Sequence, residues 1–142
     1  MAEALKLARM AADEGEVPVG CVVVRDGAVI GRGRNRREKN KSALAHAELE
    51  AIEEACAEVK DWRLSGCCIY VTLEPCPMCA GAILNARLDT VCYGARDPNT
   101  GSCGSVINLF EENYGFRPKI YGGIMEDECA GLLKDFFGDL RR

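Results

Sequence analysis

The stretch of the sequence that most restricts the fold is an apolar run that passes directly into a helical pattern. Residues 67–73 are hydrophobic and favour a β-strand. Glu74-Pro75 ends that run, and Pro77 falls in the first turn of a helix predicted over 77–84, where a missing N–H does least harm. A strand followed at once by a helix is typical of α/β domains.

The rest of the chain continues this alternation. Apolar residues at helical spacing predict three further helices, over residues 2–14, about 45–59 and about 126–140. Strands are predicted over residues 17–24, 28–34, 90–94 and 120–121. Asp26-Gly27 predicts a tight hairpin between the first two. With no repeats or low-complexity linkers, we expect a single domain over residues 1–142, an α/β fold whose sheet has helices on both sides.

Residues that bind metals or transfer protons lie close to the turn at Glu74-Pro75. Cys76 and Cys79 are three positions apart at a helix start, so both thiols share one face, where the helix N-terminus favours thiolates. His46 is the single histidine of the chain and is the natural third ligand. These three residues predict a zinc site.

The number of ligands indicates a catalytic rather than a structural zinc. A fourth protein ligand would have to be Cys67 or Cys68, roughly 20 Å away along the predicted strand. Three ligands leave a position for water, whose pKa zinc lowers from about 15.7 toward 7. Glu48, two residues after His46, can remove and deliver protons without binding the metal. The pattern therefore predicts metal-assisted hydrolysis.

Charge and cysteine content suggest partners and compartment. The net charge is -4, yet six bases stand against one acid in what we call the basic strip, which consists of Arg32, Arg34, Arg36, Arg37, Lys39 and Lys41. Such a strip can hold phosphates, although an ordinary solvated loop would look the same. The cysteines outside the motif are expected to be reduced, buried thiols. Lacking an apolar leader at its start or a run of about 18 apolar residues, the chain is expected to be cytoplasmic and not in a membrane.

The pair H-x-E and P-C-x-x-C is the signature of zinc nucleobase deaminases, and the chain resembles the bacterial tRNA-specific adenosine deaminases of the cytidine/deoxycytidylate deaminase-like superfamily. The resemblance rests on Glu16-Val17-Pro18-Val19-Gly20, Arg34-Asn35, His46-Ala47-Glu48, residues 70–82, Gly94-Ala95-Arg96-Asp97, Glu128-Cys129 and Phe136-Phe137. It implies a three-layer α/β/α cytidine deaminase-like fold with a central mixed sheet of about five strands. It also implies a homodimer with one Zn²⁺ per subunit.

The activity that the resemblance implies is hydrolysis of adenosine to inosine at the wobble position of a tRNA anticodon stem-loop. Zinc-bound hydroxide would attack C6 of a flipped-out adenine, with Glu48 as the proton shuttle and His46, Cys76 and Cys79 as ligands. The implied substrate contacts are Asn35, Val17, Pro18, Val19, Ala47, Pro75 and Asp97. The implied RNA contacts are Arg34, Arg36, Phe116, Phe137, Arg141 and Arg142.

Several alternatives stay open. Gly115-Phe116 stands where this family has Asn-His, which leaves specificity at that edge undecided. Asn35 and Asp97 also suit ordinary turns, and the phenylalanines suit a core. The same chemistry would serve a free nucleobase or nucleoside deaminase of the guanine or cytosine type. A non-catalytic, zinc-stabilised RNA-binding subunit is the third reading, against which the presence of Glu48 argues.

Overall fold

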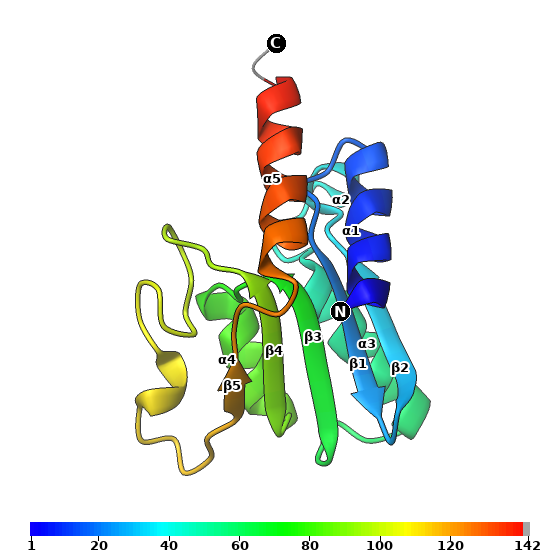
Figure 1. The fold of residues 1–142 in the computed structure, drawn as a ribbon. Coiled ribbons are helices and arrows are strands. Elements are labelled where there is room, and N and C mark those ends of the chain that lie inside the picture. Colours follow the sequence, from blue (N-terminus) through cyan, green and yellow to red (C-terminus); the bar gives the residue numbers. More distant parts are fainter. Residues whose placement is uncertain (141–142) are drawn as a thin grey trace.

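A mixed five-stranded sheet forms the centre of the protein in the computed structural model, which describes residues 1–140 (Figure 1). Its strands are β1 (Gly20–Arg25), β2 (Ala28–Arg34), β3 (Cys67–Leu73), β4 (Thr90–Ala95) and β5 (Lys119–Tyr121), in the order β2-β1-β3-β4-β5. β1 is antiparallel to β2 and β3, whereas β3, β4 and β5 run parallel. The expected mixed sheet is confirmed.

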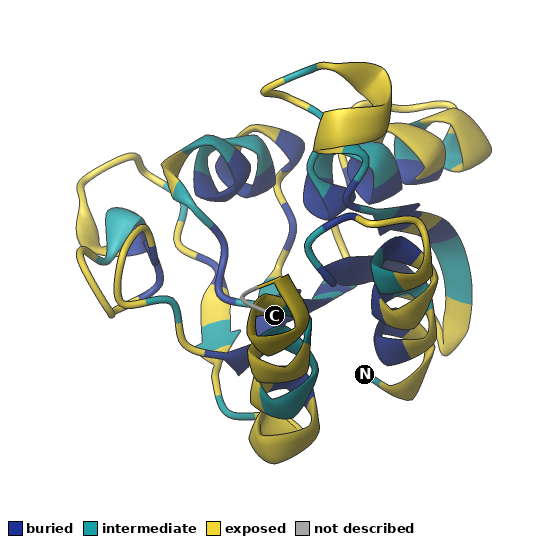
Figure 2. Cartoon of the chain, turned by 90° about the horizontal axis from the view of Figure 1, so that it is seen from above, coloured by how far each residue is buried: buried dark blue, intermediate teal, exposed yellow. Residues whose placement is uncertain are grey.

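Helices cover both faces of this sheet. α1 (Ala2–Asp13) and α5 (Glu126–Leu140) lie on one face, and α3 (Ala47–Val59) and α4 (Pro77–Ala86) lie on the other. Seen from above, the buried residues of the helices face the sheet between them (Figure 2). The three-layer α/β/α arrangement is thus confirmed. No helix within residues 1–140 is long and apolar enough to cross a membrane.

Alternation along the central strands decides which side chains fill the main core. Ile69 and Val71 of β3, with Val91 of β4, are fully buried in the cluster shared with α3 and α4. Gly33 of β2 lets α3 lie directly on the sheet, because a Cβ there would be 2.1 Å from the Ala47 carbonyl oxygen. This close approach fixes the start of α3 against the sheet.

The hairpin between β1 and β2 is the tight turn that Asp26-Gly27 predicts. Both residues have positive φ, 51° and 78°, as a two-residue hairpin turn with the twist of its strands requires. The first strand, however, begins at Gly20 and not at Val17. Pro18 has no N–H to pair, and the Val19 N–H donates to the Val17 carbonyl instead. Residues 17–19 therefore form a turn before β1.

Two short helices lie in segments that the sequence pattern leaves as loops. α2 (Arg37–Asn40) follows β2, and the 3₁₀ helix η1 (Leu109–Glu111) precedes β5. All nine cysteines are free thiols, as expected, but Cys56 and Cys68 are half-exposed. Cys68 is on the sheet face opposite the main core, where its Sγ lies 4.0 Å from that of Cys92.

Candidate metal centre and substrate pocket

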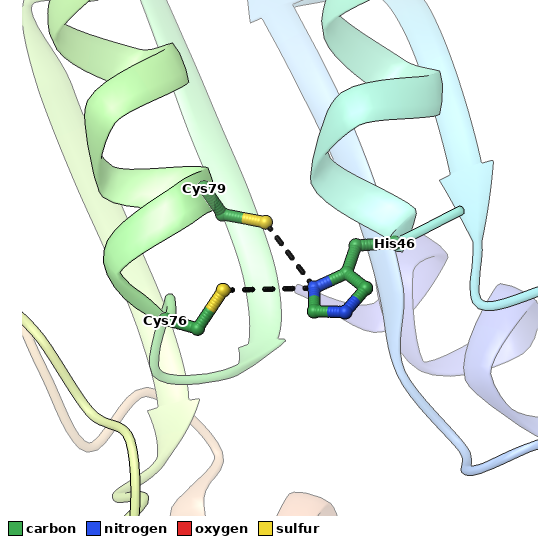
Figure 3. A group of neighbouring side chains, drawn as sticks. All are labelled: His46, Cys76 and Cys79. Atoms are coloured by element: carbon green, nitrogen blue, oxygen red, sulfur yellow. Dashed lines mark hydrogen bonds between the residues drawn. The ribbon is translucent and has the colours of Figure 1, made fainter. Parts of the chain in front are cut away.

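The three predicted metal ligands meet where two helices begin. His46 is the N-cap residue of α3 and Cys76 is that of α4, with Cys79 one turn further on. His46 Nδ1 lies 3.6 Å from Cys76 Sγ and 3.4 Å from Cys79 Sγ (Figure 3). Bonds of about 2.0–2.3 Å in tetrahedral geometry place ligand atoms about 3.5 Å apart. The donor set and its spacing therefore fit a zinc ion.

The thiols of Cys76 and Cys79 have pKa values that are shifted in opposite directions. The hydrogen bond from Cys79, with a further one from His46, lowers the pKa of the Cys76 thiol to about 4. The pKa of Cys79 is raised, because it is hydrogen-bonded to Cys76 and is buried. The His46 pKa is raised, chiefly by its hydrogen bond to Cys76. Cys76 is therefore the more acidic thiol of the pair, and both thiols must lose their protons to bind a metal.

Glu48 lies in the first turn of α3, beside these ligands. Its side chain is buried, with 4% of the residue exposed, and it lines the same cavity as His46 and Cys76. Removal from water raises the pKa of its carboxyl group to about 7. A buried carboxyl group that is next to the cluster, yet separate from it, suits proton transfer.

The cavity above the cluster has a volume of about 170 Å³. Sites for drug-sized ligands typically measure about 300–1,000 Å³, so this one suits a single flat heterocycle of about the size of a nucleobase. Eight predicted site residues line it or its floor: Val17, Val19, Asn35, His46, Ala47, Glu48, Cys76 and Asp97. The other lining residues are Arg37, Leu73, Glu74 and Thr100.

Asn35 is held in one orientation by the backbone around it. Its N–H donates to the Val19 carbonyl at 3.1 Å, and its Oδ1 accepts from the Arg37 N–H at 3.0 Å. The residue is buried, with 8% exposed. Because the backbone uses Oδ1, the side-chain NH₂ group is left to donate to a ligand.

Glu74 is a buried carboxylate whose role the sequence pattern does not reveal. It accepts hydrogen bonds from the N–H groups of Asp97 at 3.1 Å, Cys103 at 3.0 Å and Ser105 at 3.1 Å, and from the Ser105 hydroxyl. Burial raises its pKa and these hydrogen bonds lower it, with a net lowering. Glu74 thus fixes the loop over residues 97–105, which forms one wall of the cavity.

Within that wall, the side chain of Asp97 forms hydrogen bonds inside its own loop. Its carboxylate accepts from the Asn99 N–H at 3.0 Å, and from the Thr100 N–H at 3.2 Å and hydroxyl at 2.9 Å. The opposite wall has a similar attachment, since buried Glu16 accepts from the N–H groups of Glu38 at 3.0 Å and Lys39 at 2.8 Å. A buried carboxylate thus anchors each wall.

Two arginines expected to contact RNA have carboxylate partners. Arg34 pairs with Glu14, and the Nε of Arg36 lies 2.9 Å from a carboxylate oxygen of Glu50. The neighbouring Lys39 also pairs with Glu14, at 3.4 Å. Much of the basic strip is therefore already matched by acids that are distant in the sequence.

The remaining predicted residues that the structure describes lie outside the cavity. Pro18 and Pro75 are buried nearby, and the Pro75 carbonyl accepts from Ser102 in the loop that Glu74 holds. Phe116 lies beside the C-terminal end of α4. Phe137 is 43% exposed on α5, in edge contact with Phe136. Arg141 and Arg142 lie outside the described residues.

Comparisons with known proteins agree with this fold and show the family of the chain. Residues 1–141 match the sequence model of the MafB19-like deaminase family, and the chain belongs to that family. Over its full length it is 46% identical to the tRNA-specific adenosine deaminase of Bacillus subtilis, covering 89% of that protein. The resemblance to bacterial tRNA-specific adenosine deaminases is thus confirmed.

Two further comparisons extend this result. The chain superimposes with a TM-score of 0.88 on a structure from a study of A-to-I editing by tRNA:A34 deaminases, at 44% identity and with coverage of 92% of this chain and 95% of that one. The cytidine deaminase-like fold is confirmed by this match. The full chain is also 48% identical to part of the tRNA(Ile)-lysidine synthase of Deinococcus radiodurans, of which it spans only 25%.

Proposed function

We propose that this protein hydrolyses adenosine to inosine at the wobble position of a tRNA anticodon, releasing ammonia. The observation that carries the proposal is the buried Glu48 beside the His46, Cys76 and Cys79 cluster, in a cavity that suits one base. The names of its relatives support adenosine in tRNA as the substrate. Hydrolysis of a cyclic amidine C–N bond is the reaction class.

His46, Cys76 and Cys79 would hold one zinc ion per chain. Zinc bound there supplies Lewis acidity that lowers the pKa of a water molecule. Only three protein side chains converge in the described cluster, which suits a catalytic rather than a structural ion. This donor set supports the proposed metal requirement and the proposed ligand roles.

The residues of the chain supply positioning and proton transfer. Glu48 takes a proton from the attacking water and delivers it toward the departing amino group. The NH₂ group of Asn35 donates to an acceptor on the base, and Val17 and Val19 pack against the ring. Because the cavity suits one base, the target adenine must leave the stack of the anticodon loop to enter it.

Incubation with an anticodon stem-loop tests this proposal. The zinc-loaded protein should convert a wobble adenosine to inosine, which is read as guanosine after reverse transcription. A stem-loop with guanosine at that position is the control. Absence of inosine from a folded, zinc-replete protein would contradict the proposal. Turnover of free guanine or cytosine that is insensitive to salt would instead favour a free-base deaminase, because phosphate-driven binding weakens with salt.

We also propose that the protein forms a homodimer through α4. A hollow on the surface beside this helix is lined by both apolar and polar residues: Gly81, Leu84, Asn85, Arg87, Leu109, Tyr114 and Phe116. A two-fold arrangement would cover this surface on both copies. Light scattering should give twice the 15.4 kDa of one chain, and a monomer at micromolar concentration would contradict the proposal. The single-domain and cytoplasmic assignments stay predictions from the sequence.

A further inference from the structure

We infer that Arg37 binds a phosphate flanking the target base and thereby makes the pocket prefer a nucleotide within RNA to a free base or nucleoside. The inference rests on the proposed deaminase function, which it deepens by assigning the substrate class to one side chain. Arg37 is not among the RNA contacts that the sequence resemblance implies. Its position in the cavity wall singles it out.

The first argument is the location of Arg37. Two basic residues are among the described residues that line the cavity, Arg37 and the metal ligand His46. Arg37 is therefore the one that is available to bind an anion. Its backbone N–H donates to the Oδ1 of Asn35 at 3.0 Å, so the residue that would hold the base and the arginine share one turn. A base held by Asn35 therefore brings its own ribose and phosphates close to Arg37.

The second argument is the freedom of its side chain compared with its neighbours. Arg34 and Arg36 have side chains that are 17% and 26% exposed, each in close contact with a carboxylate. The side chain of Arg37 is 52% exposed, and its Nε lies 3.9 Å from Glu38, a carboxylate that is itself 77% exposed. Such a long, solvated ion pair contributes little, so Arg37 can turn to another anion without losing a strong partner.

The third argument is the charge of the cavity itself. Three acids line it, Glu48, Glu74 and Asp97, and the whole chain carries a net charge of -4. A polyanion that approaches this cavity meets repulsion unless a cation lies at its rim. A guanidinium group binds phosphate through two parallel N–H···O hydrogen bonds. A free base carries no phosphate and gains nothing from it.

Binding measurements on an inactive protein test the inference without relying on catalysis. In a zinc-loaded Glu48→Ala background, the dissociation constant of an anticodon stem-loop is measured by fluorescence anisotropy over a series of salt concentrations. Arg37→Ala should raise it about tenfold, since a charge-assisted contact is lost. The slope of log Kd against log salt should fall by about 0.7–0.9, the value of one phosphate contact. The dissociation constant of Arg37→Lys should lie between those of the parent protein and of Arg37→Ala, because lysine keeps the positive charge but cannot form the paired guanidinium hydrogen bonds.

Kinetics provide a second measurement. In the active protein, Arg37→Ala should raise KM for the stem-loop about tenfold and leave kcat within about twofold, since the contact is made equally before and during reaction. Arg37→Gln, which retains most of the side-chain volume, should behave in the same way. Both variants should keep the melting temperature of the parent protein, since Arg37 is half-exposed.

Two arginines serve as matched controls. Arg32 is exposed on β2 within the same basic strip, and Arg9 is exposed on α1. Alanine at either should change the stem-loop affinity less than twofold. If Arg32→Ala and Arg37→Ala weaken binding equally, the strip acts as a diffuse field and the inference is wrong. An unchanged salt slope for Arg37→Ala would also overturn it. Failure of the proposed function is distinguishable, because the unsubstituted protein would then form no inosine.

Discussion

Glu48→Ala should abolish deamination of the anticodon stem-loop while zinc stays bound. General acid–base groups typically contribute about 10²–10⁴-fold to a rate, so a loss of at least about 10²-fold is expected. The Glu48 carboxylate is buried in the cavity wall, beside the ligand His46. Of the described carboxylates that line the cavity, it is the one in the same helical turn as His46. Single-turnover kinetics on the stem-loop, together with metal analysis of the same samples, measure both quantities.

Two variants make the Glu48 experiment specific. Glu48→Gln preserves the shape of the side chain and removes its proton-accepting oxygen, so it should lose activity to a similar extent. Glu54→Ala alters an exposed glutamate of the same helix and should leave the rate within about twofold. Unchanged turnover in Glu48→Ala would show that proton transfer runs through another group.

Cys76→Ala should sharply reduce the zinc content, and activity should fall with it. Cys76 supplies one of the three ligand atoms, all within 4.8 Å of one another, and it is the more acidic thiol of the cysteine pair. Two remaining ligands bind zinc far more weakly. The metal content per chain, measured by plasma mass spectrometry after gel filtration, should drop from about one to well below one.

The fold should survive this loss. The sheet has an apolar core of its own between β3, α3 and α4, so Cys76→Ala should retain its circular dichroism spectrum. Its melting temperature should fall by the stabilisation that zinc binding supplies, and it should no longer rise when zinc is added. Cys56→Ala, a half-exposed cysteine far along α3 from the ligands, is the control. Normal zinc stoichiometry in Cys76→Ala would refute its role as a ligand.

Local sequence signals were sufficient for the order of the five strands and the four longer helices, and for the metal cluster. Asp26-Gly27 predicts its hairpin because positive φ at both positions is a property of the turn itself. Likewise, Cys76 and Cys79 come together because three-residue spacing on a helix needs no tertiary information. The pairing of His46 with them could be inferred because the chain contains a single histidine.

What the sequence could not supply depends on contacts between distant residues. Glu74 meets Ser105 across 31 positions, and no local pattern links a glutamate before a proline to that loop. In the same way, six bases in one strip are visible, but which of them meet Glu14 and Glu50 is decided by how α1 and α3 pack on the sheet. The roles of individual arginines therefore emerge only in three dimensions.

The attachment of the loop over residues 97–105 has a consequence for protein engineering. Glu74 holds this loop mainly by accepting hydrogen bonds from main-chain N–H groups. Most side chains of the loop therefore take no part in this attachment. Gly101 is an exception, because a Cβ there would lie 2.5 Å from the Glu74 carboxylate. Libraries that keep Gly101 and Ser105 and randomise Asn99 and Thr100 can therefore search for new substrate preferences while the metal site and its scaffold stay intact.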